Sequence, residues 1–357
     1  MKKIFRFLIG NYYLFRKKHP FVYFIFFRFL SIVLTLFVLG FAVFALMDLT
    51  PGDIVDNYVK NQIMNMSEYR TRNNVITEEM IAQARARLGL DKPFYVQYFT
   101  WLKKVIIEHD LGKSMIYRTP ILFLIRSRLI NSLVLNLISL FFITISSFAL
   151  GIYFSSKAGT RTDLAVTFFA LFFHAFPGIL LMILLQLFAS VTGLFPITAY
   201  PQNVIAAREP LKFTFSYLHH ILLPLIAAFL GGIGGTMRMI RSTMLDQLGQ
   251  PYIMALRSRG IPEWRIYFSH AFRNTLNPYI TGSADLLASL FSGSLILEII
   301  FSYPGIGSLM YEAVLQEDIY LVLANIMFIS FLVLFGMLIS DILLAVVDPR
   351  IKYQSNS

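Results

Sequence analysis

The feature that most constrains this chain is a set of six apolar stretches, each long enough to cross a lipid bilayer. A helix needs about 20 mostly apolar residues to traverse a hydrocarbon core roughly 30 Å thick. The composition agrees, since 57% of the 357 residues are hydrophobic and 14% are charged, whereas soluble domains carry about 25% charged residues. The sequence therefore predicts an all-α integral membrane protein with six transmembrane helices at 29–48, 131–154, 164–191, 219–240, 277–301 and 322–347.

Positive charge predicts the orientation of these spans. The net charge is +11, and a bilayer accounts for it better than a nucleic acid because Lys and Arg collect on the cytoplasmic flanks of spans. The segment before the first acid, Asp48, holds only basic charges, at Lys2, Lys3, Arg6, Arg16, Lys17, Lys18 and Arg28. We therefore expect a first span that is not cleaved, cytoplasmic N and C termini, and no nucleic-acid partner.

The segments outside the spans differ greatly in length. Residues 1–28 form a basic and aromatic cytoplasmic extension, and 348–357 form a short cytoplasmic tail. Between them, the extracytoplasmic region 49–130 is too long to be a simple connector, and loops of that size normally have structure or function. A large outer region after the first helix is therefore part of the expected architecture.

Two pieces of the outer region carry local signals. Acidic residues after Thr77 and a stop at Gly89 predict a short helix over 78–88. The stretch 93–107 mixes aromatic residues with lysines. That composition suits the bilayer interface, and it suits packing on the ends of the spans equally well. The sequence leaves both interpretations open.

Catalytic motifs are absent or incomplete. The run Asp110-Leu111-Gly112-Lys113-Ser114 ends like a phosphate-binding loop, but Ile107 stands where that motif requires its first glycine. The chain has no cysteine, and its histidines show no metal-ligand spacing. We expect no catalytic residue, no metal and no cofactor on this chain.

Polar and small residues inside the spans form a second group of candidates. A charged group at bilayer depth costs at least about 2.5–3.5 kcal/mol on insertion scales, so such residues face the protein interior or a wet cavity. Small residues permit close helix packing or line a polar path, and both interpretations remain open. Pro177 also predicts a kink. The candidates are His174, Pro177, Gly282, Ser283, Asp285, Ser289, Ser292, Gly293 and Glu298.

The inner loop 241–276 has a more specific pattern. Pro251 suits a first helical position, the run to Arg259 is compatible with a helix, and Gly260 supplies a stop. Pro262 then opens a second helix that leads to the fifth span. The sequence predicts a short helix, a sharp turn and a helix on the cytoplasmic side.

Here the chain resembles the transmembrane subunits of type I ABC importers, whose EAA loop has a glycine between two helices. Ala255 matches its first alanine, Gly260 its glycine, and Pro262-Glu263-Trp264-Arg265 the segment that follows. Met254 and Leu256 replace the name-giving glutamate and the second alanine. The resemblance is to the B-type dipeptide, oligopeptide and nickel permeases. It extends to Pro51-Gly52-Asp53, Leu88-Gly89-Leu90-Asp91-Lys92-Pro93, Asp110-Leu111-Gly112-Lys113-Ser114, His270-Ala271-Phe272-Arg273-Asn274, Glu298-Ile299-Ile300-Phe301-Ser302-Tyr303-Pro304-Gly305-Ile306-Gly307 and Asp348-Pro349-Arg350.

This resemblance implies a type I ABC importer permease fold with its core at 131–347, in a bacterial cytoplasmic (inner) membrane. It implies as partners a second permease subunit, most often a different chain, two ABC ATPase subunits that hold ATP-Mg, and an extracytoplasmic solute-binding protein. The solutes of related permeases are peptides, nickel chelates or similar small molecules.

The loop would couple the permease to ATP hydrolysis on the partner subunits. We expect Tyr252, Ile253 and Leu256 to be buried in a cleft of the ATPase, with Arg257 or Arg259 near its acids. The full set of coupling candidates is Tyr252, Ile253, Ala255, Leu256, Arg257, Arg259, Gly260, Pro262 and Glu263. The competing hypothesis is an ion-coupled secondary transporter or channel that uses Asp285 or Asp341. Inverted repeats, which many such folds contain, are not evident in the sequence.

Overall fold

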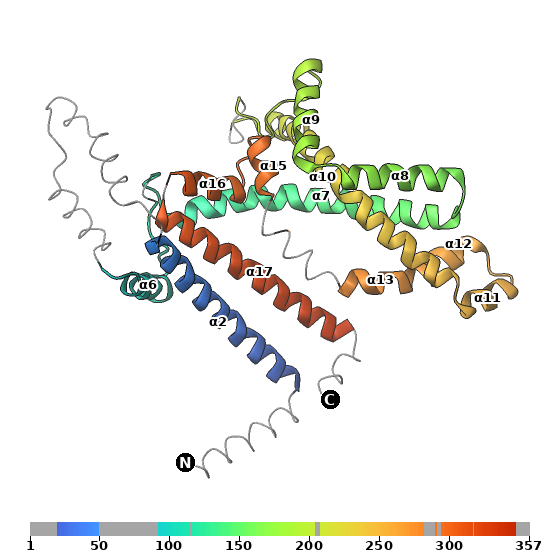
Figure 1. Ribbon diagram of the computed structural model, residues 1–357, viewed down its shortest axis with the longest axis horizontal. Helices are drawn as coiled ribbons and strands as arrows, with labels where there is room; N and C mark the ends of the chain where they lie inside the picture. The colour runs from blue at the N-terminus through green and yellow to red at the C-terminus, as the bar shows by residue number, and fades with distance from the viewer. Residues whose placement is uncertain are drawn as a thin grey trace, which may run out of the picture. The chain divides into compact units, whose positions relative to one another are not determined.

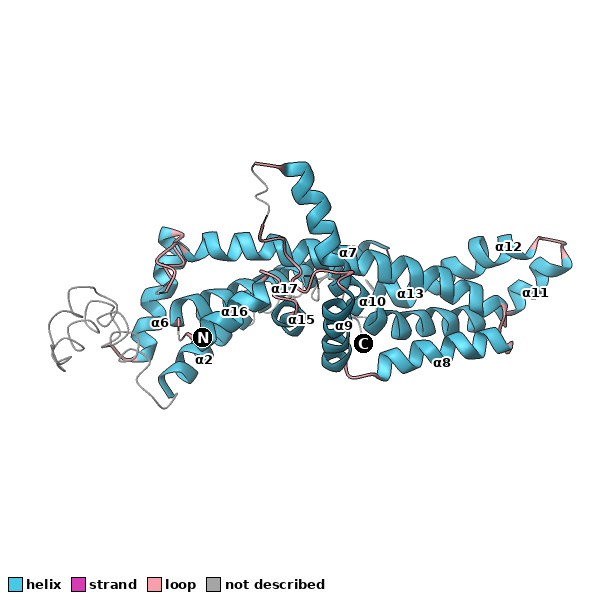
Figure 2. Cartoon of the chain, turned by 90° about the horizontal axis from the view of Figure 1, so that it is seen from above, coloured by secondary structure: helices cyan, strands magenta, loops and turns pink. Residues whose placement is uncertain are grey.

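The structure, a computed structural model, describes residues 20–49, 92–114, 116–203, 208–281, 290, 294–316 and 318–347. Within these ranges the regular secondary structure is helical, apart from one isolated bridge between Lys113 and Pro120, and loops connect the helices (Figures 1 and 2). The helices are α2 (Pro20–Leu49), α6 (Phe94–Lys103), the π-helix η1 (Lys104–Glu108), α7 (Ile121–Ser156), α8 (Arg161–Ala175), α9 (Gly178–Thr192), α10 (Pro210–Leu248), α11 (Pro251–Ser258), α12 (Glu263–Arg265), the π-helix η2 (Ile266–Ala271), α13 (Phe272–Thr281), α15 (Leu295–Ile300), α16 (Ile306–Leu315) and α17 (Ile319–Val347).

Four helices are long and apolar enough to cross a membrane. They are α2, α7, α10 and α17, and they contain the spans expected at 29–48, 131–154, 219–240 and 322–347. The bent pair of α8 and α9 raises the number to five if the pair counts as one span. The fifth expected span, 277–301, overlaps α13 and α15, and most of its middle lies outside the described residues, as does the helix expected at 78–88.

The third expected span, 164–191, is not one continuous helix. The axes of α8 and α9 differ in direction by 98° across a short break. Phe176 has extended backbone angles, φ −70° and ψ 134°, because the ring of the following Pro177 disfavours the helical region for the residue before it. Proline also lacks the N–H that a continuous helix needs. The kink expected at Pro177 is present, and it is sharp enough to divide the span.

The chain separates into two compact units. The first combines residues up to Ser127 with Leu309–Leu338 and the last six residues. In it, α2 and α17 lie side by side (Figure 1), and Gly40 of α2 lets them approach, since a Cβ there would stand 3.1 Å from the Met327 sulfur. Ser114 donates a hydrogen bond of 2.5 Å to Asp318, which also caps α17 by accepting from the Leu321 N–H.

The second unit comprises 128–308 and 339–351. One apolar cluster joins α7, α9, α10 and α15 through Leu135, Ala189, Ile221, Leu297 and Phe301. A second lies at the other end of α10 and is described with the loop below. Between the two clusters, α8 packs closely on α10 because Gly234 of α10 has no side chain. A Cβ at this position would overlap the backbone of Ala170.

Two glycines three residues apart on α10 test this packing. Gly234→Ala is expected to destabilise the protein by about 1–3 kcal/mol, because the neighbouring backbone cannot move aside as a flexible side chain can. A Cβ at Gly231 would meet no other atom within 4 Å, so Gly231→Ala is the matched control. It should leave stability unchanged or raise it by up to about 1 kcal/mol through helix propensity. Thermal unfolding of the purified protein in detergent measures both, and equal effects would contradict the account of this contact.

Candidate functional site

The loop between α10 and α13 has the expected helix, turn and helix. α10 continues past the expected end of its span to Leu248, and Pro251 begins α11 at the first helical position. Gly260 then adopts φ +73°, a left-handed conformation that glycine accepts without strain. Pro262 precedes α12, which runs through η2 into α13. A proline start and a glycine turn therefore produce a tight elbow, formed by α11, the turn at Gly260 and α12.

An apolar cluster fixes the elbow to the spans. Ile253 of α11 is completely buried and packs with Ile152 at the end of α7, Ile240 and Met244 of α10, and Ile266. Tyr252 and Leu256 are half-buried against the same cluster. The expectation that Ile253 fills a cleft of a partner is therefore wrong: its side chain already occupies the interior of this chain. Ile253 holds α11 in place. The sequence alone does not show whether an apolar side chain packs inside its own chain or against a partner.

A different set of side chains faces outward. Met254, Trp264 and Phe268 are exposed by 66%, 61% and 57%, and Ala255 and Gly260 are also exposed. The Arg265 guanidinium lies 5.4 Å from the centre of the Trp264 ring. Met254, Trp264 and Phe268 are not among the coupling residues expected from the sequence. Their spacing along the helices is consistent with exposure. Met254 follows the buried Ile253 by one position, and Trp264 and Phe268 lie two positions from the buried Ile266, so all three lie on other faces of their helices.

Arg257 also has a partner within the loop. Its Nε and Nη2 donate to the two carboxylate oxygens of Glu263 at 2.8 and 3.3 Å, so the pair bridges the turn at Gly260. The hydrogen bond to this carboxylate raises the pKa of Arg257, and the guanidinium stays charged. Both side chains are exposed, Arg257 by 43% and Glu263 by 57%. The structure thus pairs Arg257 with an acid of its own chain and leaves Arg259 exposed.

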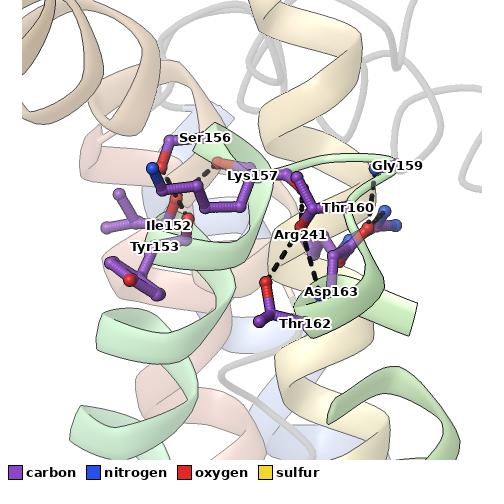
Figure 3. Close-up of polar contacts among 10 residues, drawn as sticks. Ile152, Tyr153, Ser156, Lys157, Gly159, Thr160, Thr162, Asp163 and Arg241 are labelled. Atoms are coloured by element: carbon purple, nitrogen blue, oxygen red, sulfur yellow. Dashed lines mark hydrogen bonds and ion pairs between the residues drawn. The ribbon is translucent and has the colours of Figure 1, made fainter. Parts of the chain in front are cut away.

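A buried ion pair joins the start of α8 to α10 (Figure 3). Arg241 of α10 donates from Nε and Nη2 to the carboxylate of Asp163 at 2.7 and 2.6 Å. Asp163 is 1% exposed and Arg241 22%. The same carboxylate accepts from the Gly159 N–H, and Thr160 caps the start of α8 by accepting from the Asp163 N–H. This pair is not predictable from local sequence pattern, because its members are 78 positions apart.

The intramembrane candidates are placed only in part. Gly282, Ser283, Asp285, Ser289, Ser292 and Gly293 lie outside the described residues. His174 is exposed, with Nδ1 3.2 Å from the carbonyl oxygen of Gly231, and Pro177 forms the break before α9. Asp341 lies in α17 and is half-buried.

Glu298 has a clear structural position. It is 1% exposed and accepts hydrogen bonds from the Ser132 hydroxyl at 2.6 Å and from the Ser308 N–H at 2.9 Å. The Ile306 N–H in turn donates to Ser132. Gly305 stands so close that a Cβ there would overlap the carboxylate. Glu298 therefore satisfies free N–H groups at the start of α16, as helix termini require.

The Asp163–Arg241 pair yields a quantitative prediction. Removing one member leaves the other charge poorly solvated, so Asp163→Asn should cost about 2–4 kcal/mol of stability. A double-mutant cycle with Arg241→Gln isolates the interaction between the two side chains. The exposed pair Arg257 and Glu263 is the control, and its own cycle should give at most about 1 kcal/mol. Denaturant unfolding of the purified protein measures both. Equal interaction energies for the two pairs would show that the Asp163–Arg241 pair does not hold α8 to α10.

Comparison with known proteins supplies the family. The family described as binding-protein-dependent transport system inner membrane component matches residues 147–353, and the family for the N-terminal part of such membrane components matches 21–146. The chain is 34% identical over 268 residues to the oligopeptide transport system permease protein AppB of Bacillus subtilis, which covers 75% of this chain and 83% of that protein.

Two other relatives give the same result. The inner membrane ABC transporter permease protein YejB of Escherichia coli O157:H7 is 30% identical over 303 residues, 84% of this chain and 83% of its own. A putative peptide transport system permease protein of Brucella abortus is 34% identical over 277 residues, 77% and 85% of the two chains. This chain therefore belongs to the inner membrane components of binding-protein-dependent transport systems, and it is a multi-pass, non-catalytic permease subunit that works with ATPase and binding-protein partners.

Proposed function

We propose that this chain and a second, different permease subunit together form an import path for peptides, driven by two ATPase subunits and supplied by an extracytoplasmic binding protein. Relatives named for peptide or oligopeptide transport support the choice of solute. In this proposal ATP-Mg binds to the partner ATPases, and this chain holds no cofactor.

The proposed topology has six spans with both termini in the cytoplasm. Four spans correspond to single long helices. The broken pair α8 and α9 supplies the third, and the segment from α13 to α15 supplies the fifth. The basic residues at both ends of this arrangement support the orientation, and it places the elbow and residues 1–28 on the cytoplasmic side with 49–130 outside.

The observation that carries the coupling proposal is an exposed apolar face on a firmly anchored elbow. Met254 and Trp264 present large apolar surface, while Ile253 ties the same elbow to α7 and α10 from beneath. Exposed apolar patches that are not lipid-facing are typical of protein interfaces, and aromatic and Met side chains are enriched there. We assign this face to the ATPase, with Ala255, Gly260 and Pro262 allowing close approach.

The mechanical path follows from the same contacts. A push on α11 reaches α10 through Ile253, Ile240 and Met244. It reaches α8 through Arg241 and Asp163. Closure of the ATPase dimer would thereby move α10 and α8 together, as packed elements move in rigid-body transitions. In this proposal, energy released on the ATPases opens and closes a path in a chain that binds no nucleotide itself.

Trp264→Ala tests the assignment. The side chain is exposed, so its truncation should leave the fold intact while binding-protein-stimulated ATP hydrolysis by the assembled complex falls several-fold, or the ATPase subunits no longer copurify. Phe215→Ala is the matched control, because Phe215 is also a strongly exposed aromatic residue, 72% against 61% for Trp264, and lies in the first turns of α10, far along that helix from the elbow. Unchanged stimulation in the Trp264→Ala complex would refute docking at this face.

A bulky residue at Ala255 provides an independent test of the same face. Ala255 is exposed on α11, so Ala255→Trp adds volume outside the chain's own core and should weaken ATPase binding by steric exclusion. Ser258→Trp, near the end of the same helix, tests how far the interface extends. The measurement is the amount of ATPase retained by the affinity-purified permease pair, and full retention in the Ala255→Trp complex would contradict the proposal.

A further inference from the structure

The helix α6 of the outer region has three distinct faces. Tyr98 and Trp101 are buried, at 0% and 5% exposure. Tyr95 and Phe99, one turn apart on a neighbouring face, are exposed by 49% and 51%. Opposite them, as the helical repeat of about 3.6 residues per turn requires, lie the polar residues Gln97 and Thr100.

The buried face packs on α2. The Tyr98 hydroxyl donates a hydrogen bond of 2.8 Å to the carbonyl oxygen of Phe37, and its ring centre lies 5.4 Å from that of Phe44. Gly40 makes room for this contact, since a Cβ there would come within 2.9 Å of the Tyr98 ring. In Figure 1, α6 is seen end-on while α2 runs across the picture, so the two helices cross.

These contacts fix the level of α6 along a spanning helix. α2 runs from Pro20 to Leu49, and its contacts with α6, at Phe37, Gly40 and Phe44, all lie in the half nearer Leu49. α6 therefore crosses the spanning helix towards one of its ends, which is where a helix in the bilayer interface would lie.

The exposed aromatic face also continues an exposed apolar surface of α2. The Phe99 ring centre lies 6.1 Å from that of Phe37, which is itself 38% exposed, and Val38 beside it is 55% exposed. Beyond the end of α6, Ile106 and Ile107 of η1 are exposed by 62% and 65%. Lys103 and Lys104, between Phe99 and Ile106 in the sequence, are exposed, and their positive charges favour a position near lipid phosphates.

We propose that α6 and η1 form an interfacial anchor embedded in one leaflet of the bilayer, with Tyr95, Phe99, Ile106 and Ile107 among lipid chains and Gln97 and Thr100 toward water. The leaflet is the outer one on the proposed topology, whereas the lipid contact itself does not depend on that topology. The anchor holds α6 against the first span through Tyr98, so the segment before α7 has a fixed position along α2.

The absence of cysteine from the chain makes a spin-label experiment direct. Single-cysteine variants Phe99→Cys and Thr100→Cys are labelled with a nitroxide in the assembled transporter, its other subunits made cysteine-free, in phosphatidylcholine and phosphatidylglycerol vesicles. Power-saturation measurements then compare collisions with oxygen, which concentrates in lipid, and with a water-soluble nickel chelate. The two positions are adjacent and about 100° apart around the helix, so Thr100 is the matched control.

The expected result is an oxygen-to-nickel accessibility ratio several-fold higher at position 99 than at position 100. A label at position 99 reached mainly by nickel would show that this face meets water. A label reached by neither reagent would show that another subunit covers it. Either result would overturn the lipid anchor while leaving the ATPase assignment untouched, because the elbow is tested by separate variants.

Discussion

The small apolar cluster around Ile253 is the contact on which the proposed mechanism depends. It converts a protruding loop into a rigid extension of two membrane helices, since Ile152, Ile240, Met244 and Ile266 enclose a side chain with no exposed surface. Close packing transmits displacement because interiors have few voids and low compressibility. Without this cluster, force applied to α11 would bend the chain at Gly249 and Gln250, which join α10 to α11, instead of moving α10.

Electrostatic contacts extend the same rigid body. Asp163 and Arg241 form a two-point, buried ion pair that fixes the start of α8 to α10, and Gly234 allows the two helices to approach further along. Glu298 and Ser132 serve a related purpose at α16, where a buried carboxylate and a hydroxyl satisfy backbone N–H groups of a helix start. In each case a carboxylate removed from water is balanced by several donors, which is the condition for burying it at tolerable cost.

Long-range periodicity and proline signals made much of the fold predictable. Four apolar stretches correspond to long helices, Pro177 marks a break, and Pro251 with Gly260 delimits α11. α10 extends beyond the span expected at 219–240, because the residues from Arg241 to Leu248 remain helical and pack on the chain through Met244. A hydropathy pattern indicates which residues contact lipid. It does not indicate where a helix continues beyond the membrane because contacts within the protein stabilise it.

The candidate site was predictable as a segment and not as a set of contacts. Proline and glycine positions locate the elbow, but whether Ile253 or Met254 faces inward depends on where α7 and α10 end in space. Arg257 pairs with Glu263 across a turn, and Asp163 pairs with a residue on a distant helix. Such choices arise from tertiary packing, which overrides local pattern.

The rigidity of the elbow is the central claim, and a distance measured inside it is the most direct test. Nitroxide labels at Ser242→Cys on α10 and Ser258→Cys on α11 report the relation between the two helices by pulsed electron spin resonance in the assembled transporter. The account predicts one narrow distance distribution that stays the same in the nucleotide-free and ATP-trapped states. A distribution that shifts or broadens when ATP binds would show that α11 moves independently of α10, and the proposed lever would be contradicted.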